Sequence, residues 1–173
     1  MRLESREYGM DPIAAMLILD MREIFGEDHR RIDHALAVLG YADHIRSVEG
    51  GDPLVIQAAA VLHDIGIQEA ERKYGSPAGR YQEIEGPPMA ERILRSRGVD
   101  DDRITHVCRI VANHHSARDI DTVEFRVLWD ADWLVNWPEM CQGESGMELE
   151  VKVYRILKTN TGRETALRLF AGS

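Results

Sequence analysis

The sequence predicts an all-α protein, a single-domain helical bundle, and three observations support this. Apolar residues recur at spacings of three and four along most of the 173 residues, no segment has the alternation typical of a strand, and no repeat, linker or low-complexity tract divides the chain. The hydrophobic fraction of 44% and the charged fraction of 29% are those of an ordinary globular protein. A chain of this length can bury one substantial core.

The first half of the chain holds three predicted helices, over residues 11–27, 28–49 and 52–64. Asp11 and Pro12 stand where an N-cap and a first-turn proline are favoured. The segment 52–64 also opens with Asp-Pro and is apolar almost all round, as expected of a central helix. Gly66 is well placed to stop it.

The segment 68–86 is polar and rich in glycine and proline, with Pro87-Pro88 directly after it, and it predicts a long loop. Such a loop inside a compact domain is more often functional than idle. Helical spacing then resumes, at 87–98, 101–115, 122–137, 147–160 and 162–170.

Charge and composition exclude several classes of function. The net charge of −9 opposes binding to a nucleic acid polymer or an anionic membrane, yet it allows a small phosphorylated substrate. No apolar run approaches the roughly 20 residues of a membrane span, and the start "MRLESREYGMDP" is too charged for a signal peptide. Cys108 and Cys141 form no CxxC pair. We expect a cytoplasmic protein with reduced thiols.

The stretch "AAAVLHDIGI" places His63 and Asp64 at the end of the most apolar helix, where a carboxylate needs a partner. Other imidazoles and carboxylates occupy three further predicted helices: His34, Asn113-His114-His115, Asp130 and Asp132. A single core histidine is usually satisfied by backbone or water, and a helical aspartate is usually solvated. Four helices carrying such groups favour a metal, because imidazole with carboxylate is the ligand set of Zn²⁺, Mn²⁺ or iron.

The order of these residues resembles the H…HD…D signature of the HD-domain metal-dependent phosphohydrolase superfamily. The resemblance runs from about Arg31 to Arg168 through "RRIDHALAVLGYA", "AAVLHDIG" and "LKTNTGRETALRLF". The segment "WDADWLVN" resembles the Ala-Asp-x-Leu-x-Asn form of the guanosine-tetraphosphate hydrolase branch and the Asp-Ala-Asp form of small bacterial members. It implies one HD-type domain over 1–173, with an N-terminal helix (1–27), a core (28–141) and C-terminal helices (142–173).

The resemblance implies that one divalent metal ion (Mn, Fe, Zn, Ni, Co or Mg) is held by four residues: His34, His63, Asp64 and Asp132. Asp132 matches the final aspartate of the signature, so Asp130 is interpreted either as a group that orients a ligand or water or as an exposed helix carboxylate. The remaining catalytic residues implied are Asp64, which orients the attacking water, with His114 and His115. The candidate substrate-binding residues are Arg31, Lys73, Arg80 and Asn136, and for the three cations the alternative is a solvated surface position.

Some positions depart from the family pattern. Ile67 replaces a lysine that follows "HDIG" in many members, and Gly86 replaces a histidine of the two-metal branch. We therefore expect one tightly held ion and a weaker second ion at His114 and His115, unless Glu83 or Glu85 completes that second site.

Three functions compete. The leading one is a metal-dependent phosphohydrolase acting on a small phosphate ester or a nucleotide. The alternatives are a diiron HD-type oxygenase and a non-catalytic metal-binding HD domain that senses a ligand. Trp129, Trp133 and Trp137 lie on apolar helix faces, either packed internally or in the contact of a homodimer.

Overall fold

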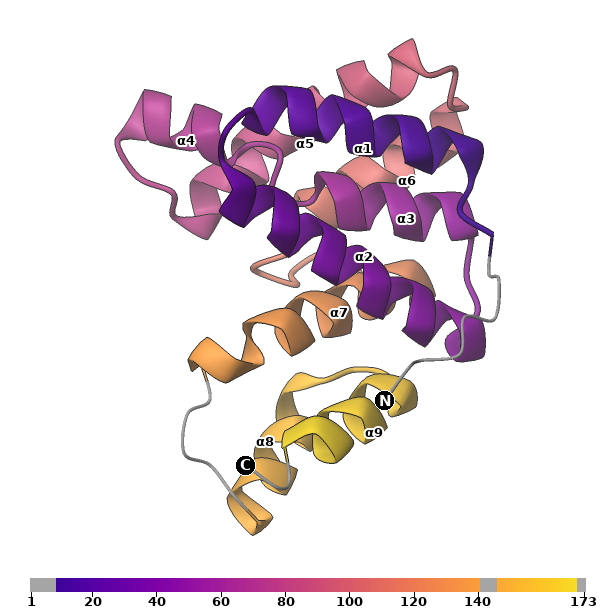
Figure 1. Ribbon diagram of the computed structural model, residues 1–173, viewed down its shortest axis with the longest axis vertical. Coiled ribbons are helices and arrows are strands. Elements are labelled where there is room, and N and C mark those ends of the chain that lie inside the picture. The colour runs from indigo at the N-terminus through magenta and orange to yellow at the C-terminus, as the bar shows by residue number, and fades with distance from the viewer. Residues whose placement is uncertain (1–8, 141–145, 171–173) are drawn as a thin grey trace.

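The computed structural model describes residues 9–140 and 146–170, and these ranges form helices joined by short turns, without a strand (Figure 1). The helices are α1 (Pro12–Phe25), α2 (His29–Glu49), α3 (Pro53–Leu62), α4 (Ile67–Tyr74), α5 (Gly79–Ser96), α6 (Asp101–Val111), α7 (Val123–Met140), α8 (Met147–Ile156) and α9 (Asn160–Phe170). The all-α prediction is confirmed. No helix in the described ranges is long and apolar enough to cross a membrane. Cys141 and most of the charged amino-terminal stretch lie outside the described residues.

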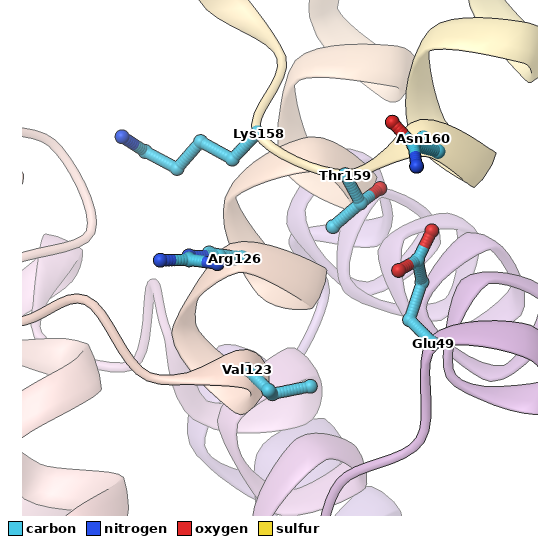
Figure 2. A pocket seen from close by; sticks show the side chains of 6 residues that line it. All are labelled: Glu49, Val123, Arg126, Lys158, Thr159 and Asn160. Atoms are coloured by element: carbon cyan, nitrogen blue, oxygen red, sulfur yellow. The ribbon is translucent and has the colours of Figure 1, made fainter.

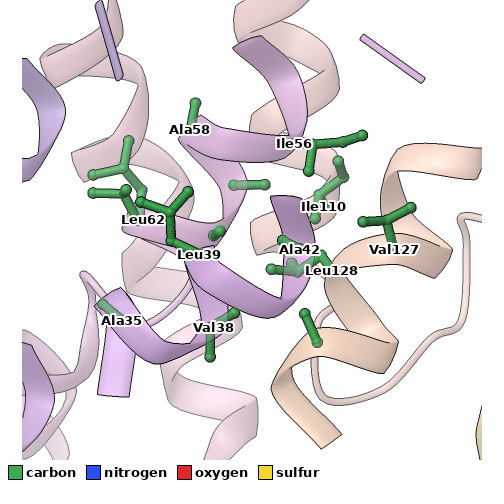
Figure 3. Close-up of a cluster of buried hydrophobic side chains, with 14 of the residues drawn as sticks. Ala35, Val38, Leu39, Ala42, Ile56, Ala58, Leu62, Ile110, Val127 and Leu128 are labelled. Atoms are coloured by element: carbon green, nitrogen blue, oxygen red, sulfur yellow. The ribbon is translucent and has the colours of Figure 1, made fainter. Parts of the chain in front are cut away.

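Helix α3 lies at the centre of the bundle, as its uniform hydrophobicity predicts. It packs against α1, α2, α6 and α7, and every residue from Leu54 to Leu62 is buried. Side chains from α2, α3, α6 and α7 meet in one apolar cluster (Figure 3), including Leu39, Ile56 and Leu128. The packing of α3 therefore fixes the position of the residues that follow its last turn.

The aspartates that open the first three helices cap them. Asp11 accepts a hydrogen bond from the Ile13 amide at 2.8 Å, and Asp52 accepts one from the Leu54 amide at 3.0 Å. Asp28 does the same for α2. Each bond satisfies an amide that the first helical turn leaves without a partner.

The end of α3 differs from the prediction. The helix ends at Leu62, and Gly66 precedes α4 instead of stopping α3. A Cβ atom at Gly66 would lie 2.4 Å from the backbone nitrogen of Gly86. Gly66 therefore allows α5 to approach the turn that carries His63 and Asp64.

The predicted loop over 68–86 is wrong, because this segment contains α4 and the start of α5, separated only by residues 75–78. Gly86 lies inside α5, where a Cβ atom would lie 2.7 Å from Cγ1 of Val111. Pro87 and Pro88 are also accommodated within α5. Packing of α5 against α4 and α6 outweighs the low helix propensity of these residues.

The C-terminal helices α8 and α9 are fastened to α7 by Asp130. This fully buried carboxylate accepts hydrogen bonds from the Lys158 amide and from the amide and hydroxyl of Thr159, each at 2.7 Å. Burial raises the pKa of Asp130 despite these bonds. Both interpretations made from the sequence are corrected: Asp130 is neither exposed nor in contact with a candidate metal ligand, and it fixes the α8–α9 connection.

The tryptophans of α7 pack within the chain. Trp137 is buried and stacks on Phe170 of α9 with ring centroids 5.8 Å apart, while Trp129 donates a hydrogen bond to the carbonyl of Ile156 at 3.1 Å. Trp133 is partly buried between them. The internal alternative accounts for these rings, and the homodimer stays a prediction.

Candidate metal centre

Residues from three helices bring a first group of candidate ligands together. His34 lies on α2, His63 follows the last residue of α3, and Asp132 lies on α7. Their nearest ligand atoms all lie within 4.8 Å of one another, with His34 Nε2 3.1 Å from Asp132 Oδ1 and 3.2 Å from His63 Nε2. The consecutive helices α2 and α3 and the distant α7 thus place three ligand atoms around one point.

The hydrogen bonds of His63 fit a metal at this point. Its Nδ1 donates to the Ala60 carbonyl at 2.9 Å, so Nε2 faces His34 and, once deprotonated, offers its lone pair there. Two imidazole nitrogens 3.2 Å apart need a proton or a cation between them. A backbone bond of this kind also orients the ring, as is usual for metal-binding histidines.

A second group lies beside the first and consists of Asp64, His114 and His115, whose ligand atoms again lie within 4.8 Å of one another. His114 Nδ1 donates to the Val111 carbonyl at 2.7 Å, whereas its Nε2 is buried without a hydrogen-bond partner. Buried nitrogens are rarely left in this state. The orphaned atom is 3.3 Å from Asp64 Oδ1 and is available to a metal or substrate.

Asp64 connects the two groups. Its Oδ1 approaches His114, while its Oδ2 lies 3.4 Å from His63 Nε2 and 3.7 Å from His34 Nε2. A carboxylate with one oxygen directed to each group has the geometry of a bridging ligand. All five histidines and aspartates of the first group, the bridge and His114 were predicted from the sequence.

The imidazoles of the centre lower the pKa values of its two carboxylates. Burial alone would raise the pKa of Asp64, but the charge of His63 and then the nearby His114 hold it well below its usual value. For Asp132, burial is likewise outweighed by His34 and His63, and its pKa is lowered. Both carboxylates are therefore ionised at neutral pH and can neutralise a bound cation.

The histidines differ in the direction of their shifts. Burial would lower the pKa of His63, yet the charge of Asp64 and then Asp132 raises it to about 9. Partial burial of the His115 ring and the adjacent His114 lower the pKa of His115 to about 4, although the residue is open to solvent on one side. In the metal-free protein His115 is thus neutral at pH 7, whereas His63 carries a proton.

The cations predicted to bind substrate are already paired or stacked. Arg31 contacts Glu71 at 2.6 Å and Asp28 at 3.0 Å, which ties α2 to α4. Lys73 contacts Glu85 at 2.7 Å. Their roles in substrate binding stay predictions.

Two further predicted contacts have structural partners too. The Arg80 guanidinium lies 4.5 Å from the ring centroid of Tyr81. Asn136 donates from Nδ2 to Asp132 Oδ1 at 2.9 Å, so it orients a candidate ligand directly.

Glu83 and Glu85, the two candidates for completing a second ion site, both accept hydrogen bonds from other groups. Glu85 accepts hydrogen bonds from Lys73 and from the hydroxyl of Tyr74 at 2.8 Å. Glu83 Oε1 accepts from the backbone amides of His115 and Ser116. The predicted loop over 68–86 hid this contact, because only a helix places Glu83 on the face that meets the 113–117 turn.

A pocket of about 190 Å³ lies between the C-terminal end of α2, the start of α7 and the α8–α9 connection (Figure 2). Glu49, Arg126 and Lys158 supply its charges, and none of the predicted site residues lines it. Arg126 forms a two-pronged ion pair with Asp121, and Glu49 accepts from the amide and hydroxyl of Thr161. Glu49 thus joins α2 to α9, and Arg126 holds the segment that precedes α7.

An all-helical bundle with buried imidazoles and ionised aspartates converging at its centre defines a class of protein with an internal histidine–aspartate metal centre. Comparison with known proteins identifies the family. The family model named "HD domain" matches residues 31–137, which include every candidate ligand, and the chain belongs to the HD domain family.

One solved structure gives a further comparison, a predicted HD superfamily hydrolase from an uncultured Thermotogales bacterium at 1.45 Å resolution. It is 24% identical, with a TM-score of 0.66 over 89% of this chain and 83% of that chain. At this identity the likeness shows a shared fold. The search of curated proteins gave no significant match.

Proposed function

We propose that the protein is a metal-dependent phosphohydrolase that cleaves a small phosphate ester or a nucleotide. The observation that carries the proposal is the convergence of His34, His63 and Asp132, with Asp64 extending from this group to His114. Membership of the HD domain family supports the same reading.

Asp64 and His114 would have separate roles in such a reaction. When bound, a divalent metal polarises a phosphoryl oxygen and lowers the pKa of a coordinated water. Asp64 is ionised, so its free lone pairs can accept a hydrogen bond from the attacking water and orient it. Because His114 Nδ1 donates to the Val111 carbonyl, the neutral ring presents a lone pair at Nε2, which can accept a hydrogen bond from a water or from a protonated group of the substrate. Phosphoryl transfer needs mainly positioning and charge neutralisation.

The test is metal analysis followed by a substrate screen. Protein purified without added metal is dialysed, its ions are counted, and release of inorganic phosphate from nucleotides and sugar phosphates is measured with Mn²⁺, Mg²⁺, Co²⁺, Ni²⁺, Zn²⁺ or Fe²⁺. We expect about one tightly held ion per chain and metal-dependent phosphate release. A metal-loaded protein that releases no phosphate from any of these esters would contradict the proposal.

The second group of ligand atoms favours one alternative, a diiron oxygenase. Asp64 has an oxygen directed to each group, as a bridging ligand between two ions would. Two irons retained after dialysis, with the absorption bands of an oxygen-bridged diiron centre, would favour that activity over phosphate release. A protein that retains its ion but turns over neither substrate class would favour the non-catalytic alternative.

A further inference from the structure

The ring of His115 lies against the first residue of α5. A Cβ atom added at Gly79 would lie 2.6 Å from Cγ and Cδ2 of His115 and 2.9 Å from its Cβ. These atoms form the base of the side chain, so the ring cannot avoid the contact by moving only its far end. Gly79 has no positive φ angle, hence its lack of a side chain matters here for space and not for backbone conformation.

One helical turn further along α5, Glu83 holds the backbone of the same histidine. Its Oε1 accepts hydrogen bonds from the amide of His115 at 3.0 Å and from the amide of Ser116 at 2.8 Å. Residues four apart lie on one helix face. The same face of α5 therefore contacts His115 through both its ring and its main chain.

His115 belongs to the second group of ligand atoms, with Asp64 and His114. The first group is carried by α2, α3 and α7, and neither Gly79 nor Glu83 contributes a ligand atom to it. A shift of His115 would thus alter the second group while the first stays in place.

We propose that Gly79 and Glu83 are positioning residues that fix His115 in the second group and so set how tightly this group holds an ion. This inference rests on the proposed metal-dependent function. It gives one face of α5 a role in fixing the position of His115.

The experiment is a titration of the metal-free full chain with Co²⁺, followed by calorimetry and by visible absorption. We expect the wild type to take up two ions, one tightly and one more weakly. Gly79→Ala should keep the tight ion and bind the second about tenfold more weakly or worse, because the added Cβ displaces His115, and disturbing the orientation of a ligand typically costs about 10- to 100-fold in affinity. The matched control is Gly40→Ala on α2, where an added Cβ has open space, and it should behave as the wild type.

The Glu83 pair tests the proposal without adding bulk. Glu83→Gln keeps an oxygen that accepts from the two amides, whereas Glu83→Ala removes it. We expect Glu83→Ala to weaken the second ion and Glu83→Gln to restore most of the affinity, with helix content unchanged by circular dichroism.

Three results would overturn the proposal: a wild type that takes up a single Co²⁺, second-ion affinity unchanged in both Gly79→Ala and Glu83→Ala, or Glu83→Gln as weak as Glu83→Ala. Two-step uptake with the expected variant pattern but no phosphate release would contradict the proposed function alone.

Discussion

At the residue scale, Asp64 connects the two groups of candidate ligands. It lies next to three imidazoles, and each of its oxygens faces a different group of ligand atoms. Its removal would leave a bound cation under-compensated in a buried site, which is far more costly than losing an exposed ion pair.

Asp64→Ala should therefore lose metal and activity together. We expect metal affinity to fall by more than about 100-fold, beyond the range for outer partners of a ligand. Lys73→Ala is the comparison, because the Lys73 ammonium is partly exposed and pairs with Glu85 and Glu69 instead of a candidate ligand. It should keep its metal and mainly raise KM. Metal content by mass spectrometry checks both, and full occupancy in Asp64→Ala would show that this carboxylate does not bind the ion.

Asn136 offers a finer test of how a ligand is held. Its amide donates to the same oxygen of Asp132 that approaches His34. Asn136→Ala should weaken the first ion about tenfold, through a looser Asp132, with KM at saturating metal little changed. Asn160→Ala, in the distant pocket, is the control. If Asn136→Ala instead raises KM with metal affinity intact, the residue binds substrate, as the sequence alone predicts.

The sequence singled out candidate ligands that the structure brings together, but it did not predict the role of Asp130. His34, His63, Asp64 and Asp132 stand out because charged or imidazole groups interrupt apolar helices in a recognisable order. Asp130 shares the same helix and the same chemistry as Asp132. Its partners are backbone amides of residues 158 and 159, and no local pattern announces a contact across 28 positions.

At the scale of elements, the α7 contact with the C-terminal helices depends on that carboxylate. Asp130→Ala would leave the buried amide of Thr159 and its hydroxyl without an acceptor. Each unsatisfied buried group costs about 1–3 kcal/mol. We expect the free energy of unfolding to fall by roughly 3 kcal/mol.

Metal binding should be nearly unaffected by this change, because Asp130 makes no contact with the candidate ligands. The control is Asp119→Ala, at an exposed aspartate, which should move stability by less than about 0.5 kcal/mol. Urea titrations measure both. Equal stability of Asp130→Ala and Asp119→Ala would mean that the α8–α9 connection does not need its acceptor.

In the α4–α5 segment, glycine and proline content wrongly predicts a loop where the structure has helices. Glycine and proline at Gly75, Pro77, Gly79, Gly86 and Pro87-Pro88 indicate a loop by local propensity. Four of these glycines and prolines lie within α5, where Gly79 faces His115 and Gly86 faces Val111. Glycines that allow close packing between helices cannot be distinguished from helix-breaking glycines by the sequence alone.

At the scale of the whole molecule, stability and metal binding are linked through His63. In the metal-free protein its pKa is raised from 6.5 to about 9, so its protonated form contributes stability that is complete below pH 6.5 and is lost as pH rises through 9. A metal needs the neutral ring and must displace that proton. Rising pH thus weakens the metal-free fold and strengthens metal binding.

The increase in melting temperature caused by a fixed excess of Mn²⁺ should therefore be larger at pH 8.0 than at pH 6.5. Displacing one proton changes the apparent affinity by about tenfold, or about 1.4 kcal/mol, for each pH unit in this range. Thermal unfolding with and without Mn²⁺ measures the difference, and titrations with the His63→Ala variant serve as the control because that variant has no such proton to lose. An Mn²⁺-induced shift that is equal at both pH values in the wild type would mean that no ligand proton is displaced, and His63 would then lie outside the metal's coordination shell.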